Sequence, residues 1–365
     1  MRLVSIDMLT PDMKIARAVM NKDALILPAG RSNVVRYIPN LRNMGIEYVY
    51  VEDGKSEGIE IPDVISETTR NGCKRAFQNT MTQFVASDRL DVKNLESCID
   101  SVISDILKNP DVQISLNDIA SNDEYTFTHS VSTMVYALTI GRRLGYSSQQ
   151  MHLLGLGTLL HDIGKIIIEK EVMYKEGKLT QEEYEYVKMH TLYGYQTLRR
   201  IPNIPESARL ISYMHHERLD GSGYPRGLGG DEITEFAKIV AIADVYDALT
   251  TDRCYRKKWP ACKAMDFLYD KSRTEFDAEL VAMFTQQLAV YPNGSLVRLS
   301  DNSIAIVCRQ NASMPLRPVV RVIRDANGKE ISPRDLDLMD TLTVTVIDAE
   351  LEIDRNAPQV SANGL

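Results

Sequence analysis

A histidine followed by an aspartate at the end of an apolar segment is the feature that most constrains the fold. Residues 148–160 are rich in Leu, Met and Gly, which predicts a buried helix that runs into His161 and Asp162. Neighbouring helical residues point about 100° apart, so these two side chains cannot both face solvent if the leucines face a core. A metal ion would make the burial of such a polar pair tolerable. The alternative is a capped helix end with a satisfied core histidine, where Gly164 stops the helix and Lys165 complements its dipole.

The composition is that of an ordinary globular protein. The chain has 365 residues, of which 44% are hydrophobic and 25% charged, and this length suffices for two or three domains. Its apolar runs are too short to cross a bilayer and it begins without a signal-peptide pattern, so we expect a cytoplasmic protein with no membrane partner. Five scattered cysteines without a CxxC pair indicate neither a disulfide framework nor a zinc knuckle. A net charge of -8 argues against DNA as a partner and requires a local basic cluster for any anionic ligand.

Hydrophobic periodicity divides the chain into segments of different character. Strand-like and helix-like runs predict a small α+β module first, and a helical connector and an all-helical main domain follow. Short β-like runs with an Asn327-Gly328 hairpin signal then predict a small antiparallel β appendage, and the fold class expected is mainly α. The boundaries, ending with a disordered tail, are 1–60, 61–114, 115–292, 293–355 and 356–365. The predicted helices of the main domain cover residues 125–144, 148–161, 180–200, 205–216, 233–250, 260–272 and 277–290.

Five histidines and two aspartates fall on or beside these helices in mostly apolar surroundings. They are His129, His161, Asp162, His190, His215, His216 and Asp244, and His152 is left unassigned. So many imidazoles and carboxylates exceed what core packing explains, and seven ligands exceed what one ion takes while leaving a position for substrate. Two ions are therefore expected, one on His129, His161 and Asp244, the other on His190, His215 and His216, with Asp162 as the bridge. Imidazoles and carboxylates without thiolates suit Fe or Mn and leave Zn and Ni open.

This pattern resembles the HD-GYP domains, a branch of the HD superfamily of metal-dependent phosphohydrolases. The superfamily's H…HD…D signature falls on His129, His161-Asp162 and Asp244, and the HD-GYP features on His190, His215-His216 and the loop Asp220-Gly221-Ser222-Gly223-Tyr224-Pro225. The run from Asp244 to Thr250 with Arg253 and Arg256 is also similar, and the resemblance covers roughly residues 120–290. It implies a helical domain with two or, in some members, three metal ions, which hydrolyses cyclic di-GMP to linear pGpG and in some members on to GMP.

Two details of the resemblance bear on the cofactor and the substrate. Members with a third ion carry a glutamate one turn before the first histidine, where this chain has Tyr125 beside Glu124, so we expect two ions. Arg253 and Arg256 match phosphate-contacting positions, and arginine's planar fork suits phosphate oxygens. The neighbouring Lys257 and Lys258 are interpreted as a solvated charged turn.

The hypothesis for the chemistry is in-line attack of a metal-bridging hydroxide on phosphorus, because paired cations lower the pKa of a bridging water. Asp162 would hold both ions, and Lys165 would stabilise developing charge or protonate the leaving ribose oxygen. In the loop, Gly223, Tyr224 and Pro225 are expected to contact substrate. Tyr224 would either stack on a guanine or pack under the site, and a plain turn is the alternative for the whole loop. Some members of the family use this loop to contact diguanylate cyclase domains.

The leading hypothesis is a cyclic di-GMP phosphodiesterase, and two alternatives stay open. One is an HD hydrolase that acts on another nucleotide phosphoester, because this scaffold serves many substrates. The other is a non-catalytic receptor or adaptor that binds cyclic di-GMP and a cyclase partner, which would be expected to lack ligands or Lys165. The sequence leaves open the input signal, the roles of the N-terminal module and the β appendage, the final product, and the oligomeric state, a homodimer included.

Overall fold

The structure is a computed structural model that describes residues 1–21, 24–109, 112–114, 125–173, 175, 177–251, 259–311 and 314–348. The chain divides into two compact units, one formed by residues 63–288 and the other by residues 1–62 together with 289–365. The predicted fold class is confirmed, since a mainly helical body is accompanied by a mixed N-terminal module and a small antiparallel sheet. Among the described residues, no helix is long and apolar enough to cross a membrane.

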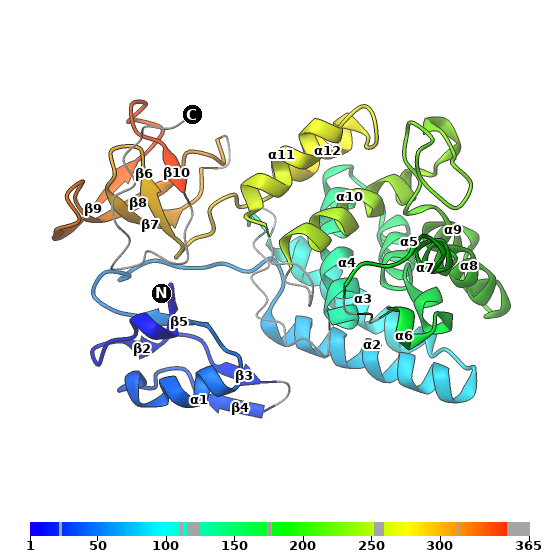
Figure 1. Cartoon of the computed structure of the whole chain (residues 1–365), viewed down its shortest axis with the longest axis horizontal. Helices are drawn as coiled ribbons and strands as arrows, with labels where there is room; N and C mark the ends of the chain where they lie inside the picture. The colour runs from blue at the N-terminus through cyan, green and yellow to red at the C-terminus, as the bar shows by residue number, and fades with distance from the viewer. Residues whose placement is uncertain are drawn as a thin grey trace. The chain divides into compact units, whose positions relative to one another are not determined.

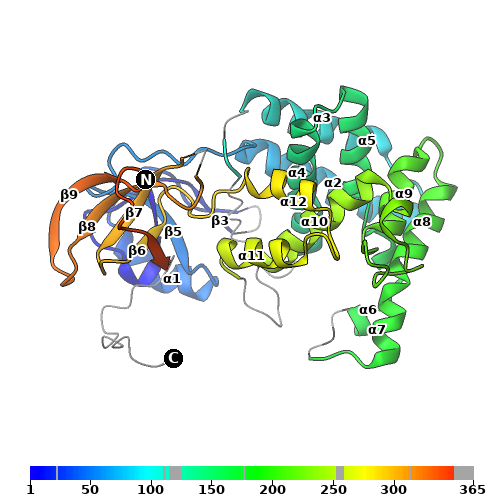
Figure 2. The same cartoon turned by 90° about the horizontal axis from the view of Figure 1, so that it is seen from above.

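The helical unit is built around α4, which packs against α5 and α10 (Figures 1 and 2). Two earlier helices, predicted as a connector, join the same unit: α2 packs on α4 and α3 on α5. The α-helices of the unit are α2 (Glu67–Ser87), α3 (Val92–Lys108), α4 (Tyr125–Arg143), α5 (Ser148–Leu159), α6 (Lys170–Met173), α7 (Gln181–Lys188), α8 (His190–Arg200), α9 (Glu206–Met214), α10 (Glu235–Thr250), α11 (Ala261–Lys271) and α12 (Ala278–Thr285). The 3-10 helices among the described residues of the unit are η4 (Ile163–Ile167) and η5 (Gly230–Glu232).

The prediction of one helix over residues 180–200 was wrong, because the chain forms α7 and α8 with a break at Met189. Side chains of α8 bond the last carbonyls of α7 at this break. His190 Nδ1 lies 2.7 Å from the Val187 carbonyl, and the Thr191 hydroxyl donates to the Lys188 carbonyl at 3.0 Å. The break thus begins a new helix at His190.

Gly164 has a different role from the predicted helix stop. α5 ends at Leu159, before His161, and Gly164 lies inside η4, against α8. A Cβ at Gly164 would lie 1.9 Å from the carbonyl oxygen of His190 and 2.5 Å from the amide of Gly194. Glycine therefore allows η4 and α8 to meet backbone to backbone, and this contact brings the segment after α5 beside His190.

Gly164→Ala should therefore destabilise the helical unit by about 3 kcal/mol, since the methyl group meets backbone that cannot give way. Thermal unfolding followed by circular dichroism measures the effect. Gly72→Ala is the matched control, because Gly72 lies on α2 with open space around its Cβ position, and alanine is the better helix former there. Equal melting temperatures for Gly164→Ala and the unchanged protein would contradict this interpretation of the contact.

The other unit combines the two ends of the chain. Its N-terminal part holds a sheet in the order β1-β5-β2 and the hairpin β3–β4, and its C-terminal part holds the antiparallel sheet β10-β6-β7-β8-β9. The strands are β1 (Arg2–Ser5), β2 (Lys14–Ile15), β3 (Val19–Asn21), β4 (Ala24–Leu27), β5 (Tyr48–Glu52), β6 (Leu296–Leu299), β7 (Ile304–Arg309), β8 (Val319–Arg324), β9 (Glu330–Asp337) and β10 (Val346–Asp348). The helices are η1 (Ile6–Met8), η2 (Val34–Tyr37) and α1 (Ile38–Asn43).

The predicted hairpin at Asn327-Gly328 joins β8 to β9, with Gly328 at a φ of 77°. The sequence of β9 shows no apolar strand pattern, because it is rich in charge and contains Pro333, both of which are tolerated on an edge strand. The two ends of the chain share apolar contacts, since Ile59 packs with Ile304, Ile306 and Ile323. The N-terminal module and the β appendage therefore form one unit.

Candidate metal centre

All seven candidate ligands predicted from the sequence come together inside the helical unit. They come from α4 (His129), the turn after α5 (His161 and Asp162), the start of α8 (His190), the segment after α9 (His215 and His216) and α10 (Asp244). Six of them are buried, and the side chain of His216 is 19% exposed. The site is therefore a polar cluster within an apolar body, and His216 is the most exposed of its seven residues.

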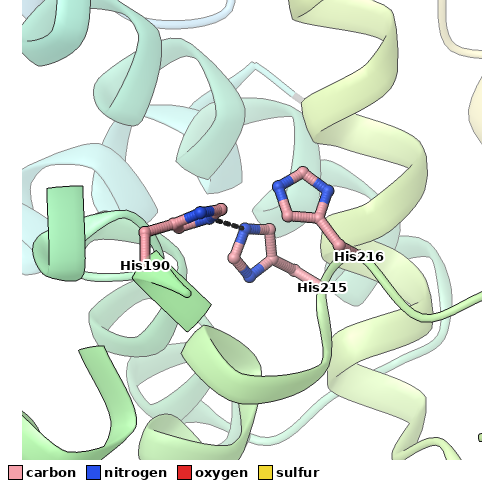
Figure 3. Close-up of side chains that lie close together, drawn as sticks. All are labelled: His190, His215 and His216. Atoms are coloured by element: carbon pink, nitrogen blue, oxygen red, sulfur yellow. Dashed lines mark hydrogen bonds between the residues drawn. The ribbon is translucent and has the colours of Figure 1, made fainter. Parts of the chain in front are cut away.

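The cluster has two halves. His129, His161 and Asp162 offer ligand atoms within 4.8 Å of one another, and so do His190, His215 and His216. Figure 3 shows the three rings of the second half directed toward one another, with His190 opposite the other two.

Asp162 faces both halves with different oxygens. Its Oδ2 lies 3.4 Å from His161 Nε2, and its Oδ1 lies 3.4 Å from His190 Nε2. Asp244 approaches both halves as well, with Oδ1 3.1 Å from His129 Nε2 and Oδ2 3.9 Å from His216 Nδ1. Each of the two carboxylates therefore lies between the two groups of imidazoles.

The protein orients these imidazoles through their Nδ1 atoms. Nδ1 of His161 lies 2.6 Å from the Thr158 carbonyl, and Nδ1 of His215 lies 3.1 Å from two carbonyls of the last turn of α9. Since a carbonyl only accepts, each Nδ1 carries the proton, and this leaves Nε2 with a free lone pair. His190 is held in the same way by Val187, and its Nε2 lies 3.4 Å from His215 Nε2. Two lone pairs that face each other in this way are suited to a shared cation.

Two buried atoms of the cluster have no hydrogen-bond partner among the described residues. They are Nε2 of His161 and Oδ1 of Asp162. A buried polar atom without a partner costs free energy, and a divalent cation would satisfy both atoms at once. Imidazole nitrogen and carboxylate oxygen are the donor set that Fe, Mn and Zn accept. The residues therefore fit the metal ions that the family resemblance implies.

Burial keeps three of the imidazoles neutral. It lowers the pKa of His190 to about 4, and it lowers the pKa values of His215 and His216 well below the usual range. A neutral imidazole is the form that binds a metal ion, so these three side chains are ready ligands at neutral pH.

The carboxylates of Asp162 and Asp244 stay ionised, and Asp244 favours a positive charge on His129 in the first half of the cluster. Burial is the largest single influence on Asp162 and opposes its ionisation, but the Lys165 ammonium and the neighbouring imidazoles of His161 and His190 together outweigh burial and hold the pKa of that carboxyl well below its usual range. Burial also opposes the charged form of His129, but hydrogen bonds to Asp244 and Asp247 raise its pKa to about 9. The environment of His129 therefore favours a cation, either a proton or a metal ion.

Lys165 lies at the edge of the cluster. Its Nζ donates to Asp162 Oδ2 at 2.5 Å, and its side chain is 26% exposed. The alternative of a cation beside a helix C-terminus does not describe this contact, because the ammonium is bonded to a candidate ligand. Lys165 thus offers a positive charge to anything that enters the site.

Asp247 is a buried carboxylate beside the cluster that was not among the candidate site residues predicted from the sequence. It lies one turn beyond Asp244 on α10, is 3% exposed, and its Oδ2 is 2.6 Å from His129 Nδ1. A carboxylate behind a ligand histidine fixes the tautomer and raises ligand basicity. Its signal in the sequence is a second aspartate on an apolar helix, three residues after the first.

Asp247→Asn should weaken metal binding by about 10–100-fold without unfolding the protein. Competition between the protein and a fluorescent chelator for Mn(II) measures the affinity. Asp100→Asn is the matched control, because Asp100 pairs with His152 at 2.7 Å on the exposed surface. Equal affinity in the Asp247 variant and the control would remove the positioning role. His152, unassigned in the sequence analysis, is engaged in this surface pair.

The Gly-Tyr-Pro loop lies beside the second half of the cluster. The Tyr224 ring stacks on His216 with centroids 4.6 Å apart and an interplanar angle of 29°. One face of Tyr224 is therefore covered by a candidate ligand, in line with the option of packing under the site. Gly223 and Pro225 flank it in the same loop. Arg253 and Arg256, with Lys257 and Lys258, lie outside the described residues, as do Glu124 and the side chain of Tyr125.

Known proteins match both parts of the chain. The HD domain family matches residues 114–280, and the family described as the KOW domain associated with HD domain matches residues 296–356. A cyclic di-GMP phosphodiesterase of Pseudomonas aeruginosa (PA4108) is 32% identical over 267 residues, which are 72% of this chain and 64% of that one. The cyclic di-GMP phosphodiesterase response regulator RpfG of Xanthomonas campestris is 41% identical over 143 residues, 39% of this chain and 38% of that one. Residues 114–280 belong to the HD domain family, with the sequence motifs of its HD-GYP branch.

Two further matches extend the comparison of this HD-GYP chain. The 3'3'-cGAMP-specific phosphodiesterase 3 of Vibrio cholerae is 36% identical over 175 residues, 48% of this chain and 38% of that one. The chain thus spans between 38% and 64% of the length of these three relatives. An HDG"Y"P protein of Bdellovibrio bacteriovorus (Bd1817) has a similar structure, with a TM-score of 0.51 and 19% identity over 77% of this chain and 97% of that one. At this identity the likeness concerns the fold alone.

Proposed function

We propose that this HD-GYP protein is a metal-dependent phosphodiesterase that hydrolyses cyclic di-GMP to linear pGpG. The observation that carries the proposal is Asp162, whose two carboxylate oxygens face two separate groups of imidazoles with unpartnered atoms between them. A binuclear centre suits phosphodiester cleavage. The Pseudomonas and Xanthomonas relatives, both named cyclic di-GMP phosphodiesterases, support this substrate.

In this proposal the seven residues hold two divalent ions, with Fe or Mn expected. His129, His161 and Asp244 would hold one ion, His190, His215 and His216 would hold the other, and Asp162 would contribute an oxygen to each. Such ions supply an activated water and neutralise the phosphate oxygens. The expectation of two ions and not three depends on Tyr125 in place of a glutamate.

The chain's own residues would bind and orient the phosphodiester. Lys165, held in place by Asp162, would donate to a phosphate oxygen or to the leaving ribose oxygen. Burial and the nearby Asp244 carboxylate raise the pKa of Tyr224, so its hydroxyl stays a hydrogen-bond donor at neutral pH. Gly223 and Pro225, on either side of Tyr224, would contact the substrate from the same loop. Arg253 and Arg256 are proposed to bind the phosphate that is not cleaved, on the family resemblance alone.

A second substrate is favoured by one comparison. The Vibrio cholerae relative, named as 3'3'-cGAMP-specific, is 36% identical and keeps a cyclic purine dinucleotide as the substrate class. The receptor reading has less support, because all seven candidate ligands and Lys165 are present. A diguanylate cyclase domain that contacts the Gly-Tyr-Pro loop, a homodimer and a cytoplasmic location remain parts of the proposal.

Substrate choice is tested by anaerobic turnover with Fe(II) or Mn(II). Cyclic di-GMP, 3'3'-cGAMP and cyclic di-AMP are compared by kcat/KM, with products followed by chromatography. We expect cyclic di-GMP to lead by at least about tenfold, with pGpG as the first product. A higher kcat/KM for 3'3'-cGAMP than for cyclic di-GMP would show that 3'3'-cGAMP is the preferred substrate. Absence of turnover with every nucleotide, despite full metal occupancy, would contradict a phosphodiesterase.

A further inference from the structure

Glu217 is a buried carboxylate next to the candidate ligands that the proposed chemistry does not use. It follows His215 and His216 directly and is 2% exposed. Within the described ranges, no lysine, arginine or histidine forms an ion pair with it. A buried charge without a cationic partner must be satisfied by other groups.

Those other groups are backbone amides of residues 226–228, which directly follow the Gly-Tyr-Pro loop (residues 220–225). Oε1 of Glu217 accepts from the Arg226 amide at 2.9 Å, and Oε2 accepts from the Leu228 amide at 2.9 Å. Both oxygens accept from these amides, and Glu217 belongs to neither of the two candidate ligand groups. Hydrogen bonds to a charged acceptor are among the stronger ones in proteins. These two hold residues 226–228, at the C-terminal end of the loop, against Glu217.

Gly223 and Tyr224 of the loop are also held by the segment that contains Glu217, residues 216–218. The Tyr224 amide donates to the His216 carbonyl at 3.2 Å. Gly223 leaves no room for a side chain, because a Cβ there would lie 2.5 Å from the His216 carbonyl oxygen and 2.5 Å from the Arg218 amide. The loop therefore lies directly on residues 216–218, and the Tyr224 ring covers the imidazole of His216.

We propose that Glu217 is a positioning residue that sets the place of Tyr224 against His216, one of the candidate metal ligands. By holding residues 226–228, it closes the loop on the segment that supplies two candidate ligands. The wall of the site that meets a cyclic purine dinucleotide then keeps one shape. The proposal rests on the proposed function, because the loop matters only if such a nucleotide is the substrate.

Glu217→Gln is the sharpest test, because it preserves size and places an amide donor against a backbone amide. We expect the KM for cyclic di-GMP to rise by about 10–100-fold, while two metal ions stay bound. Glu232→Gln is the matched control, since Glu232 accepts from Gly229 at the exposed end of the same loop. The control should stay within about twofold of the unchanged protein.

A double-mutant cycle distinguishes positioning from general stability. If Glu217 acts through Tyr224, adding Glu217→Gln to Tyr224→Ala should lower kcat/KM by less than about twofold. Effects that multiply in the double variant would overturn the proposal. Wild-type KM in Glu217→Gln alone would overturn it as well.

Limited trypsin digestion separates this proposal from the proposed function. Arg226 is exposed, and release of the loop should speed cleavage after it in Glu217→Gln but not in Glu232→Gln. Equal cleavage rates in the two variants would overturn the loop anchor, whatever the enzyme hydrolyses. Faster cleavage together with no turnover of any cyclic dinucleotide by the unchanged protein would contradict the proposed function and leave the anchor standing.

Discussion

Asp162→Asn is expected to lower kcat for cyclic di-GMP by at least about 10³-fold and to leave fewer than two ions per chain. The reason is the position of Asp162, whose oxygens lie 3.4 Å from His161 Nε2 on one side and 3.4 Å from His190 Nε2 on the other. Asparagine keeps the size but removes the charge and one of the two donor oxygens. The fold should survive, because the change removes a buried charge and leaves no cavity.

Steady-state kinetics and elemental analysis of the same preparation measure both effects. Asp100→Asn serves again as control, because its carboxylate pairs with a histidine on the surface and touches no candidate ligand. Full turnover with two bound ions in Asp162→Asn would contradict the bridging role.

Lys165→Ala should separate chemistry from metal binding. Both ions should remain, since the lysine offers no lone pair to a metal while it is protonated, whereas kcat should fall by about 10²–10³-fold. KM should change by less than about threefold, because the ammonium acts mainly on charge that develops in the transition state. Metal content and kcat/KM, measured together, give the result.

Lys175→Ala is the matched control for the lysine. Its ammonium pairs with Glu183 at 2.6 Å and its side chain is 34% exposed, close to the 26% of Lys165. It lies outside the candidate ligand clusters. If Lys165→Ala kept wild-type turnover with metals bound, the lysine would have no catalytic role.

Much of the helical fold could be predicted from periodicity and caps. The helix predicted from residue 180 begins there as α7, where Thr180 and Glu183 form a capping box, and the apolar runs locate α5 and α10. The break at Met189 could not be predicted, because it depends on a hydrogen bond between the His190 side chain and the backbone carbonyl of Val187. The contact of Gly164 with α8 depends on tertiary packing, which a turn-forming residue type does not reveal.

The candidate ligands could be found from the sequence because imidazoles and carboxylates are rare in apolar helices. Their orientation could not, since Nδ1 of His161 and of His190 is directed by backbone carbonyls that have no residue signature. Asp247 and Glu217 lie between these cases. Each is an acidic residue in a buried segment, and only the structure shows that their partners are a histidine ring and two loop amides.

The count of tightly bound ions per chain tests the central claim most directly. The protein is reconstituted anaerobically with Fe(II) or Mn(II), desalted, and analysed for metal by mass spectrometry against protein concentration. We expect two ions per chain, because one carboxylate, that of Asp162, lies close to both groups of imidazoles. One ion per chain would contradict the role of Asp162 as a ligand shared by two ions. Three ions would contradict the expectation that Tyr125, in place of a glutamate, leaves no third metal site.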